Sequence, residues 1–147
     1  MSRLQNAPAF ELQSLEGNYI DEIFAASDSG SNRFIEMLFL NLVGEDKWHR
    51  IFLDAGIGFW EKMSREKAFY DFEDCCLIDY SKRWKLNGAK IISAQCIGET
   101  WDDFTSSASG EVLVSSFQFV MDIGTINFAY AESHNMESET LIHFIPE

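Results

Sequence analysis

The side chains best suited to catalysis in this chain are its three histidines, and they form no recognisable catalytic pattern. His49 lies in an alternating segment on the side that carries polar residues, His134 lies in the acidic stretch ESHNMESE, and His143 has apolar neighbours. Nucleophilic catalysis requires a nucleophile beside a base that a third group orients. The sequence contains no Gly-x-Ser-x-Gly elbow, and no cysteine lies in a known nucleophile signature. We therefore expect core or solvated histidines and no catalytic residues, so the chain is interpreted as a protein that is not an enzyme.

The cysteines and glycines also lack the spacing of metal or cofactor sites. Cys75, Cys76 and Cys96 are odd in number, and the adjacent pair would point to opposite faces of a strand. We expect buried free thiols, with a vicinal disulfide as the alternative. Gly56 and Gly58 follow an apolar run, but Gly-x-Gly before two aromatics favours a tight turn over a phosphate loop. The sequence predicts no metal and no cofactor. An enzyme that uses a carboxylate pair remains the minority alternative, because 24 acidic residues form such pairs by chance.

Aromatic and acidic residues are mixed in two segments, and a third segment adds negative charge. The stretch ETWDDFTSSAS (residues 99–109) surrounds Trp101 with carboxylates, YDFED (residues 70–74) repeats the mixture, and NMESE (residues 135–139) is acidic. Trp101 either folds inward as a plug of the core or anchors an interface, where tryptophan is enriched. Carboxylates around an exposed ring suit lysine or arginine side chains of a partner. The predicted partner-binding residues are Tyr70, Asp71, Glu73, Asp74, Glu99, Trp101, Asp102, Asp103, Phe104, Glu137 and Glu139.

The net charge of −13 is distributed unevenly along the chain. Residues 1–32 hold five acidic residues and one basic residue, residues 33–90 hold ten of each, and residues 91–147 hold nine acidic residues with no lysine or arginine. A field of one sign repels nucleic acid and anionic membranes and steers cationic partners. We therefore expect a basic protein partner and no direct contact with nucleic acid or membrane. The alternative is that the acidity only keeps the chain soluble.

Hydrophobic residues alternate with a period of two over most of the chain, which indicates strands. One hairpin is predicted over residues 34–42 and 48–53, with a turn at residues 44–46. A second is predicted over residues 112–121 and 126–130, with a turn at residues 122–124 and a bulge near Ser115 and Ser116, where the alternation changes phase. Further strands are expected after the Asn87-Gly88 turn and at residues 141–145.

Helical spacing is limited to FWEKMSREKAFYDFED (residues 59–74), where a short helix is expected before a strand at residues 75–80. We predict a mainly β fold, an antiparallel β-sandwich or half-barrel with at most one or two short helices. No proline-rich linker divides the 147 residues, so residues 1–147 are expected to form a single domain. The first ten residues have no apolar region of signal-peptide type, and no apolar run reaches about 18 residues. The expected location is the cytoplasm.

Taken together, these features resemble immunity proteins of bacterial contact-dependent growth inhibition and related polymorphic toxin systems. The resemblance lies in overall character across most of the chain, including HRIFLDAGIGFWEK (residues 49–62) and LNGAKIISAQ (residues 86–95). It implies a chain that binds a cognate toxin domain, often a basic nuclease, and blocks its active site with an acidic and aromatic surface. The alternative is a small-ligand or peptide-binding β-domain, or an accessory protein without catalytic activity.

Overall fold

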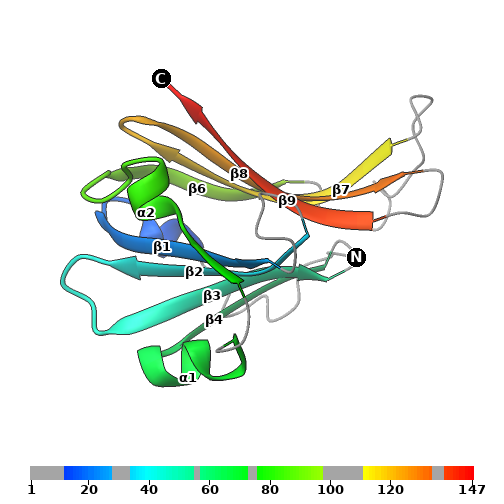
Figure 1. The fold of residues 1–147 in the computed structure, drawn as a ribbon. Helices are drawn as coiled ribbons and strands as arrows, with labels where there is room; N and C mark the ends of the chain where they lie inside the picture. The colour runs from blue at the N-terminus through cyan, green and yellow to red at the C-terminus, as the bar shows by residue number, and fades with distance from the viewer. Residues whose placement is uncertain (1–11, 28–33, 55–56, 73–75, 98–110, 134–137) are drawn as a thin grey trace.

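The protein is built from two antiparallel sheets that face each other (Figure 1). The computed structural model describes residues 12–27, 34–54, 57–72, 76–97, 111–133 and 138–147. Within them, the five-stranded sheet contains β1 (Ile20–Ser27), β2 (Ile35–Leu42), β3 (Lys47–Asp54), β4 (Ile57–Ser64) and β5 (Cys76–Asp79), in the order β4-β3-β2-β1-β5. The four-stranded sheet contains β6 (Ile91–Ile97), β7 (Glu111–Met121), β8 (Gly124–Ser133) and β9 (Ser138–Pro146), in the order β6-β7-β8-β9. The predicted mainly β, sandwich-like fold is confirmed.

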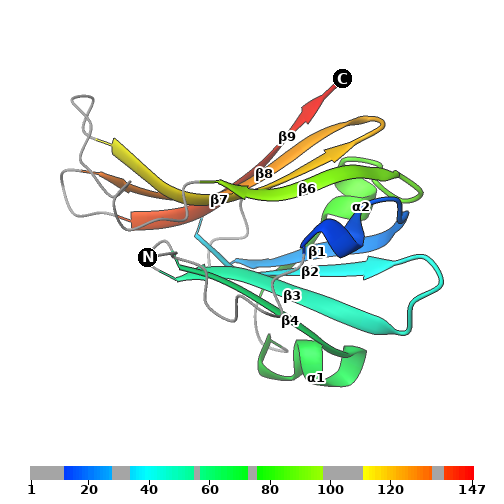
Figure 2. The same ribbon diagram turned by 180° about the vertical axis from the view of Figure 1, so that it is seen from behind.

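Helical structure in the described residues is limited to short segments. They are the α-helices α1 (Arg65–Phe69) and α2 (Tyr80–Arg83) and the 3₁₀ turns η2 (Leu12–Leu15) and η3 (Tyr70–Phe72). Figures 1 and 2 show α1 on the outer side of the five-stranded sheet and α2 at one end of the sandwich. Among these helices, none has both the length and the apolar character needed to cross a membrane.

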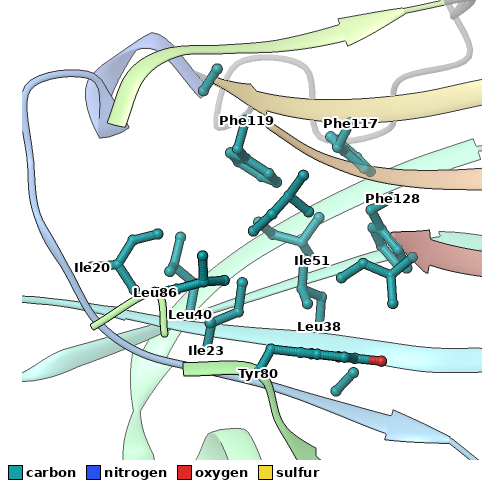
Figure 3. Packing of buried hydrophobic residues seen from close by; sticks show 14 of the residues in the cluster. Ile20, Ile23, Leu38, Leu40, Ile51, Tyr80, Leu86, Phe117, Phe119 and Phe128 are labelled. Atoms are coloured by element: carbon teal, nitrogen blue, oxygen red, sulfur yellow. The ribbon is translucent and has the colours of Figure 1, made fainter. Parts of the chain in front are cut away.

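The core lies between the sheets and consists of the inward residues of both. Phe117 and Phe128 of the four-stranded sheet are fully buried, as are Leu38 and Ile51 of the opposite sheet. Figure 3 shows these side chains pointing toward one another across the space between the sheets. Burial of this apolar surface is the main force that holds the two sheets together.

Aromatic stacking closes one end of the sandwich. Tyr80 of α2 is completely buried and stacks on Trp84 with ring centroids 4.1 Å apart. Trp84 in turn stacks on Phe144 of β9 at 5.6 Å, so the α2 segment is tied to both sheets. Burial raises the pKa of Tyr80 to about 12, and the phenol therefore stays protonated at neutral pH.

Both predicted hairpins are confirmed. β2 and β3 pair around a turn at residues 43–46, where Gly44 has the positive φ of +84° that glycine favours. β7 and β8 pair around residues 122–123, and their register shifts between Leu113 and Ser115, which is the predicted bulge.

The sequence interpretation is wrong for part of the segment 59–74. Residues 59–64 belong to β4, and the helix begins only at Arg65. Ser64 is its N-cap, because its side chain accepts a hydrogen bond from the Lys67 amide. Gly58 is likewise paired with Leu53 inside the β3–β4 hairpin and does not form a turn. The strand expected to reach residue 80 ends at Asp79, because this residue caps α2.

One burial prediction is also wrong. Cys76 is a free thiol, as expected, but it is exposed, because β5 is an edge strand and pairs only with β1. His49, which was expected either in the core or in solvent, is 2% exposed and points to the inner face of β3. The alternation in β3 did not separate a buried side from an exposed one, because Trp48 on the outer face is also buried, under α1.

Candidate functional site

A polar pocket lies on the five-stranded sheet, where the start of β1 meets the end of β5 and α2. Its cavity volume is about 310 Å³. The lining residues are Asp21, Glu22, Asp79, Ser81, Lys82 and Asn87. Three carboxylates face a single ammonium group in this pocket, so its charge is negative overall.

Local backbone features explain why these side chains come together. The register of β1 and β2 shifts between Ile20 and Glu22, and this irregularity turns Asp21 and Glu22 away from the buried Ile20. Gly88, at φ +88°, lets the chain after α2 fold back, and its amide donates a hydrogen bond to the Ile20 carbonyl at 2.7 Å. The Asn87 side chain also donates to the Asp21 carbonyl oxygen. The loop after α2 is thereby fixed beside the start of β1.

The three carboxylates of the pocket differ in how far they are already engaged. Asp79 accepts hydrogen bonds from the Ser81 hydroxyl and from the Lys82 amide at 3.2 Å, so it serves mainly as the helix cap. Asp21 has the Asn87 amide 3.4 Å from one carboxylate oxygen. The Glu22 carboxylate has no hydrogen bond or ion pair with any described residue. Glu22 is therefore the group of this pocket most available to a ligand.

The one cation of the pocket is only loosely engaged. The Lys82 ammonium lies 4.0 Å from the Asp79 carboxylate, and its side chain is 88% exposed. A pair this exposed contributes little and is easily replaced by another cation. The arrangement suits a guanidinium or ammonium group from outside, which charge-assisted hydrogen bonds to the carboxylates would hold. Among the described residues no group of three or more His, Cys, Asp or Glu side chains is placed to hold a metal ion.

The segment that follows β4 covers the outer face of the five-stranded sheet with aromatic side chains. Phe69 stacks on Phe39 at 4.3 Å between ring centroids, and Phe72 meets Phe39 edge-on at 5.3 Å. The Arg65 guanidinium lies 5.1 Å from the Phe69 ring centroid and 5.7 Å from that of Trp48, within cation–π range. Of the aromatics in this segment, Phe69 and Phe72 therefore anchor it to the sheet.

Tyr70 and Asp71 of the same segment point away from the sheet. The Tyr70 side chain is 71% exposed, and Asp71 is also exposed. Phe24 connects this feature to the pocket, because it pairs with Asp79 in the β1–β5 register and packs edge-on against Phe69. The pocket carboxylates, Tyr70 and Asp71 thus share the outer side of one sheet. We call this surface the outer acidic surface, defined by Asp21, Glu22, Asp79, Tyr70 and Asp71.

The structure therefore describes only part of the predicted interface. Tyr70 and Asp71 are exposed, and the backbone of Glu139 lies in β9, paired with Ala131. The other predicted residues lie outside the described residues: Glu73, Asp74, Glu99, Trp101, Asp102, Asp103, Phe104 and Glu137. Sequence reasoning missed Asp21, Glu22 and Asp79, which come from two distant segments. The acidic excess of residues 1–32 was the only available signal for the first two.

The described histidines lie outside the outer acidic surface. His49 lies in the inner layer, with its Nε2 2.9 Å from a Glu45 carboxylate oxygen that is also 3.5 Å from the Lys62 ammonium. Burial lowers the pKa of His49 below its usual value, although Glu45 partly offsets this effect. His143 is exposed on the outer face of the four-stranded sheet. Neither histidine lines the pocket.

Comparison of the chain with protein-family models, with curated proteins and with solved structures found no match.

Proposed function

We propose that this chain is an immunity protein that binds a cognate toxin domain through an acidic and aromatic surface and blocks the toxin's active site. The observation that carries this proposal is the outer acidic surface, where a carboxylate-lined pocket and an exposed tyrosine lie on the same side of one sheet. The resemblance of the sequence to immunity proteins supplies the biological class. The proposed partner is a basic protein, as a nuclease domain would be.

The chemistry of the surface fits a cationic partner. A nuclease has to present cations to phosphate groups, and carboxylates can take the place of phosphate oxygens in such a cleft. Glu22 and Asp71 carry charges that no described residue neutralises. The net charge of −13 adds long-range attraction, which raises association rates. Tyr70 supplies a large exposed ring that can be buried at low entropic cost.

Immunity genes of these systems lie immediately downstream of the toxin gene, so the test is the kinetics of binding to the C-terminal domain of whatever protein is encoded immediately upstream of this chain. Tyr70→Ala is expected to raise the dissociation rate by about tenfold, the loss of about 1.4 kcal/mol of contact free energy. The pair Glu22→Gln and Asp71→Asn is expected to lower the association rate by several-fold and to flatten its dependence on salt. The sequence also predicts that Trp101→Ala raises the dissociation rate. Asp102→Asn and Asp103→Asn together are predicted to lower the association rate and to flatten its dependence on salt.

Glu147→Gln is the matched control, because it removes one exposed carboxylate at the end of the other sheet. It is expected to leave the dissociation rate unchanged and to lower the association rate less than the pair does. The proposal fails if Tyr70→Ala, the paired change and Glu147→Gln all have the same effect. It also fails if association with the upstream domain is independent of salt.

One observation favours a second candidate, a domain that binds a small cationic ligand. The cavity volume of about 310 Å³ lies at the lower end of the range for small-molecule sites. This candidate predicts that a small amine or guanidinium compound binds with one-to-one stoichiometry and that Glu22→Gln abolishes its heat of binding in calorimetry. Binding of the upstream domain without any such small-molecule binding would favour the immunity function.

A further inference from the structure

Most of the four-stranded sheet is built from residues without charge, in a chain of which 24% of residues are charged. The acidic residues of its strands, Glu111, Glu132 and Glu139, lie together at one end of β7, β8 and β9. The sequence contains no Asp, Glu, Lys or Arg in residues 91–98, 112–121, 123–131 or 140–146, which make up nearly all of β6, β7, β8 and β9. In the described part of the chain, no helix or strand lies over this face (Figures 1 and 2). The outer face of the other sheet, in contrast, is covered by α1.

A row of polar side chains crosses this face from edge to edge. Gln95, Gln118, Asn127 and His143 occupy successive paired positions on β6, β7, β8 and β9. They point outward, because Phe117, which precedes Gln118, is packed in the core. The side-chain amide of Gln95 donates to Gln118 at 2.8 Å, and that of Gln118 donates to Asn127 at 3.4 Å. We call this set the amide row.

The adjacent row on the same face is also uncharged and mixes hydroxyl with apolar side chains. Ser93, Val120, Thr125 and Ile145 are paired in succession across the four strands. Ile145 is 52% exposed at the β9 edge. These two rows, with the other outward residues of the segments without charge, define the uncharged face.

We propose that the uncharged face is the interface of a homodimer, in which two copies of this chain pack their four-stranded sheets face to face. A side-chain amide is both a donor and an acceptor, so the amide row can pair with itself across a two-fold axis. The cores of protein interfaces are depleted in charged residues, as this face is. Two chains of net charge −13 can approach each other at least electrostatic cost through a surface that carries no charge.

The size of the face fits a weak dimer. Four strands about 4.8 Å apart, each presenting about seven residues of about 3.3 Å, cover roughly 400 Å² per copy in the plane of the sheet. Side-chain relief brings the total for two copies close to the roughly 1,000 Å² that a specific interface requires. We therefore expect a dissociation constant in the micromolar range. The outer acidic surface lies on the other sheet, so dimerisation and partner binding do not compete.

The test is sedimentation equilibrium of the full chain from about 5 to about 500 μM, with a reducing agent because the Cys76 thiol is exposed. The mass is expected to rise from 16.8 kDa toward twice that value with concentration. The dimer is expected to be stronger in about 0.5 M than in about 0.05 M salt, since salt screens repulsion between the two acidic copies. Binding to a cationic partner would respond to salt in the opposite direction.

Asn127→Glu is expected to weaken the dimer by at least about tenfold, because it sets two carboxylates against each other near the centre of the interface. Val43→Glu adds the same charge at the 58% exposed turn between β2 and β3 and is the matched control, with an effect within about twofold. Near-UV circular dichroism checks the fold, and Ile145→Glu at the exposed rim replaces Asn127→Glu if that variant unfolds. A native chain that stays at 16.8 kDa throughout, or a dimer that the face variants do not weaken, overturns the proposal.

Discussion

Replacing Phe69 with alanine is expected to lower the free energy of unfolding by about 2–3 kcal/mol. The Phe69 ring stacks on Phe39 at 4.3 Å and meets Trp48 and Phe24 edge-on at 5.0 and 6.0 Å. Removing a fully buried phenylalanine costs about 3–5 kcal/mol, and Phe69 is only half-buried, which sets the lower figure. The loss comes from the contact between the α1 segment and the sheet, which also positions Tyr70 and Asp71.

Urea denaturation followed by tryptophan fluorescence measures this loss, because Trp48 lies in the same cluster. A loss of 2–3 kcal/mol corresponds to a fall in Tm of about 5–10 °C for a chain of this size. Tyr70→Ala is the matched variant, since Tyr70 is the next residue but is 71% exposed, and it should cost less than about 0.5 kcal/mol. Equal losses for the two variants would refute the assignment of Phe69 as the anchor and Tyr70 as a surface side chain.

Three further predictions concern stability. Gly124→Ala should cost about 2–3 kcal/mol more than Gly44→Ala in urea melts, because a Cβ at Gly124 would lie 2.5 Å from the Ile145 carbonyl oxygen, whereas nothing lies within 4 Å at Gly44. Asp79→Ala should cost about 1 kcal/mol through loss of the α2 cap, measured in the same way. Burial lowers the pKa of His49 in the folded state, so the unfolded state binds the proton more readily. The contribution of His49 to the free energy of unfolding is therefore complete above about pH 6.5. It is lost as the pH falls from there toward the lowered pKa of the folded state. His49→Gln should flatten that decline in urea melts at successive pH values.

The hairpins were predictable because their signals are local. Alternating apolar residues on either side of a glycine-containing turn define β2 and β3, and the phase change at Ser115 and Ser116 marks the bulge in β7. The segment 59–74 was misassigned because Trp60 and Met63 satisfy helical spacing, while pairing with Ile51 and Trp48 places them in β4. That pairing is a tertiary effect, which local propensity does not contain.

The burial of His49 and the acidic pocket could not be predicted for a related reason. α1 covers the outer face of β3, so residues on both faces of this strand are buried. The alternation of polar and apolar residues in β3 therefore does not indicate which side chains face solvent. The pocket combines Glu22 with Asp79, 57 positions apart in the sequence, through the pairing of β1 with β5. Only the antiparallel sheet order brings these carboxylates together.

Growth of cells that express the C-terminal domain encoded immediately upstream, with and without this chain, tests the central claim most directly. We predict that growth stops without the chain and recovers with it, and that a chain carrying Tyr70→Ala, Glu22→Gln and Asp71→Asn together restores growth less well than a chain carrying Glu147→Gln. All chains must be present at equal levels in the cells. Equal levels are expected because Tyr70, Asp71 and Glu147 are exposed and Glu22 is only partly buried, so these substitutions should leave folding intact. An upstream domain that does not inhibit growth, or toxicity that the native chain leaves unchanged, would contradict the proposed function.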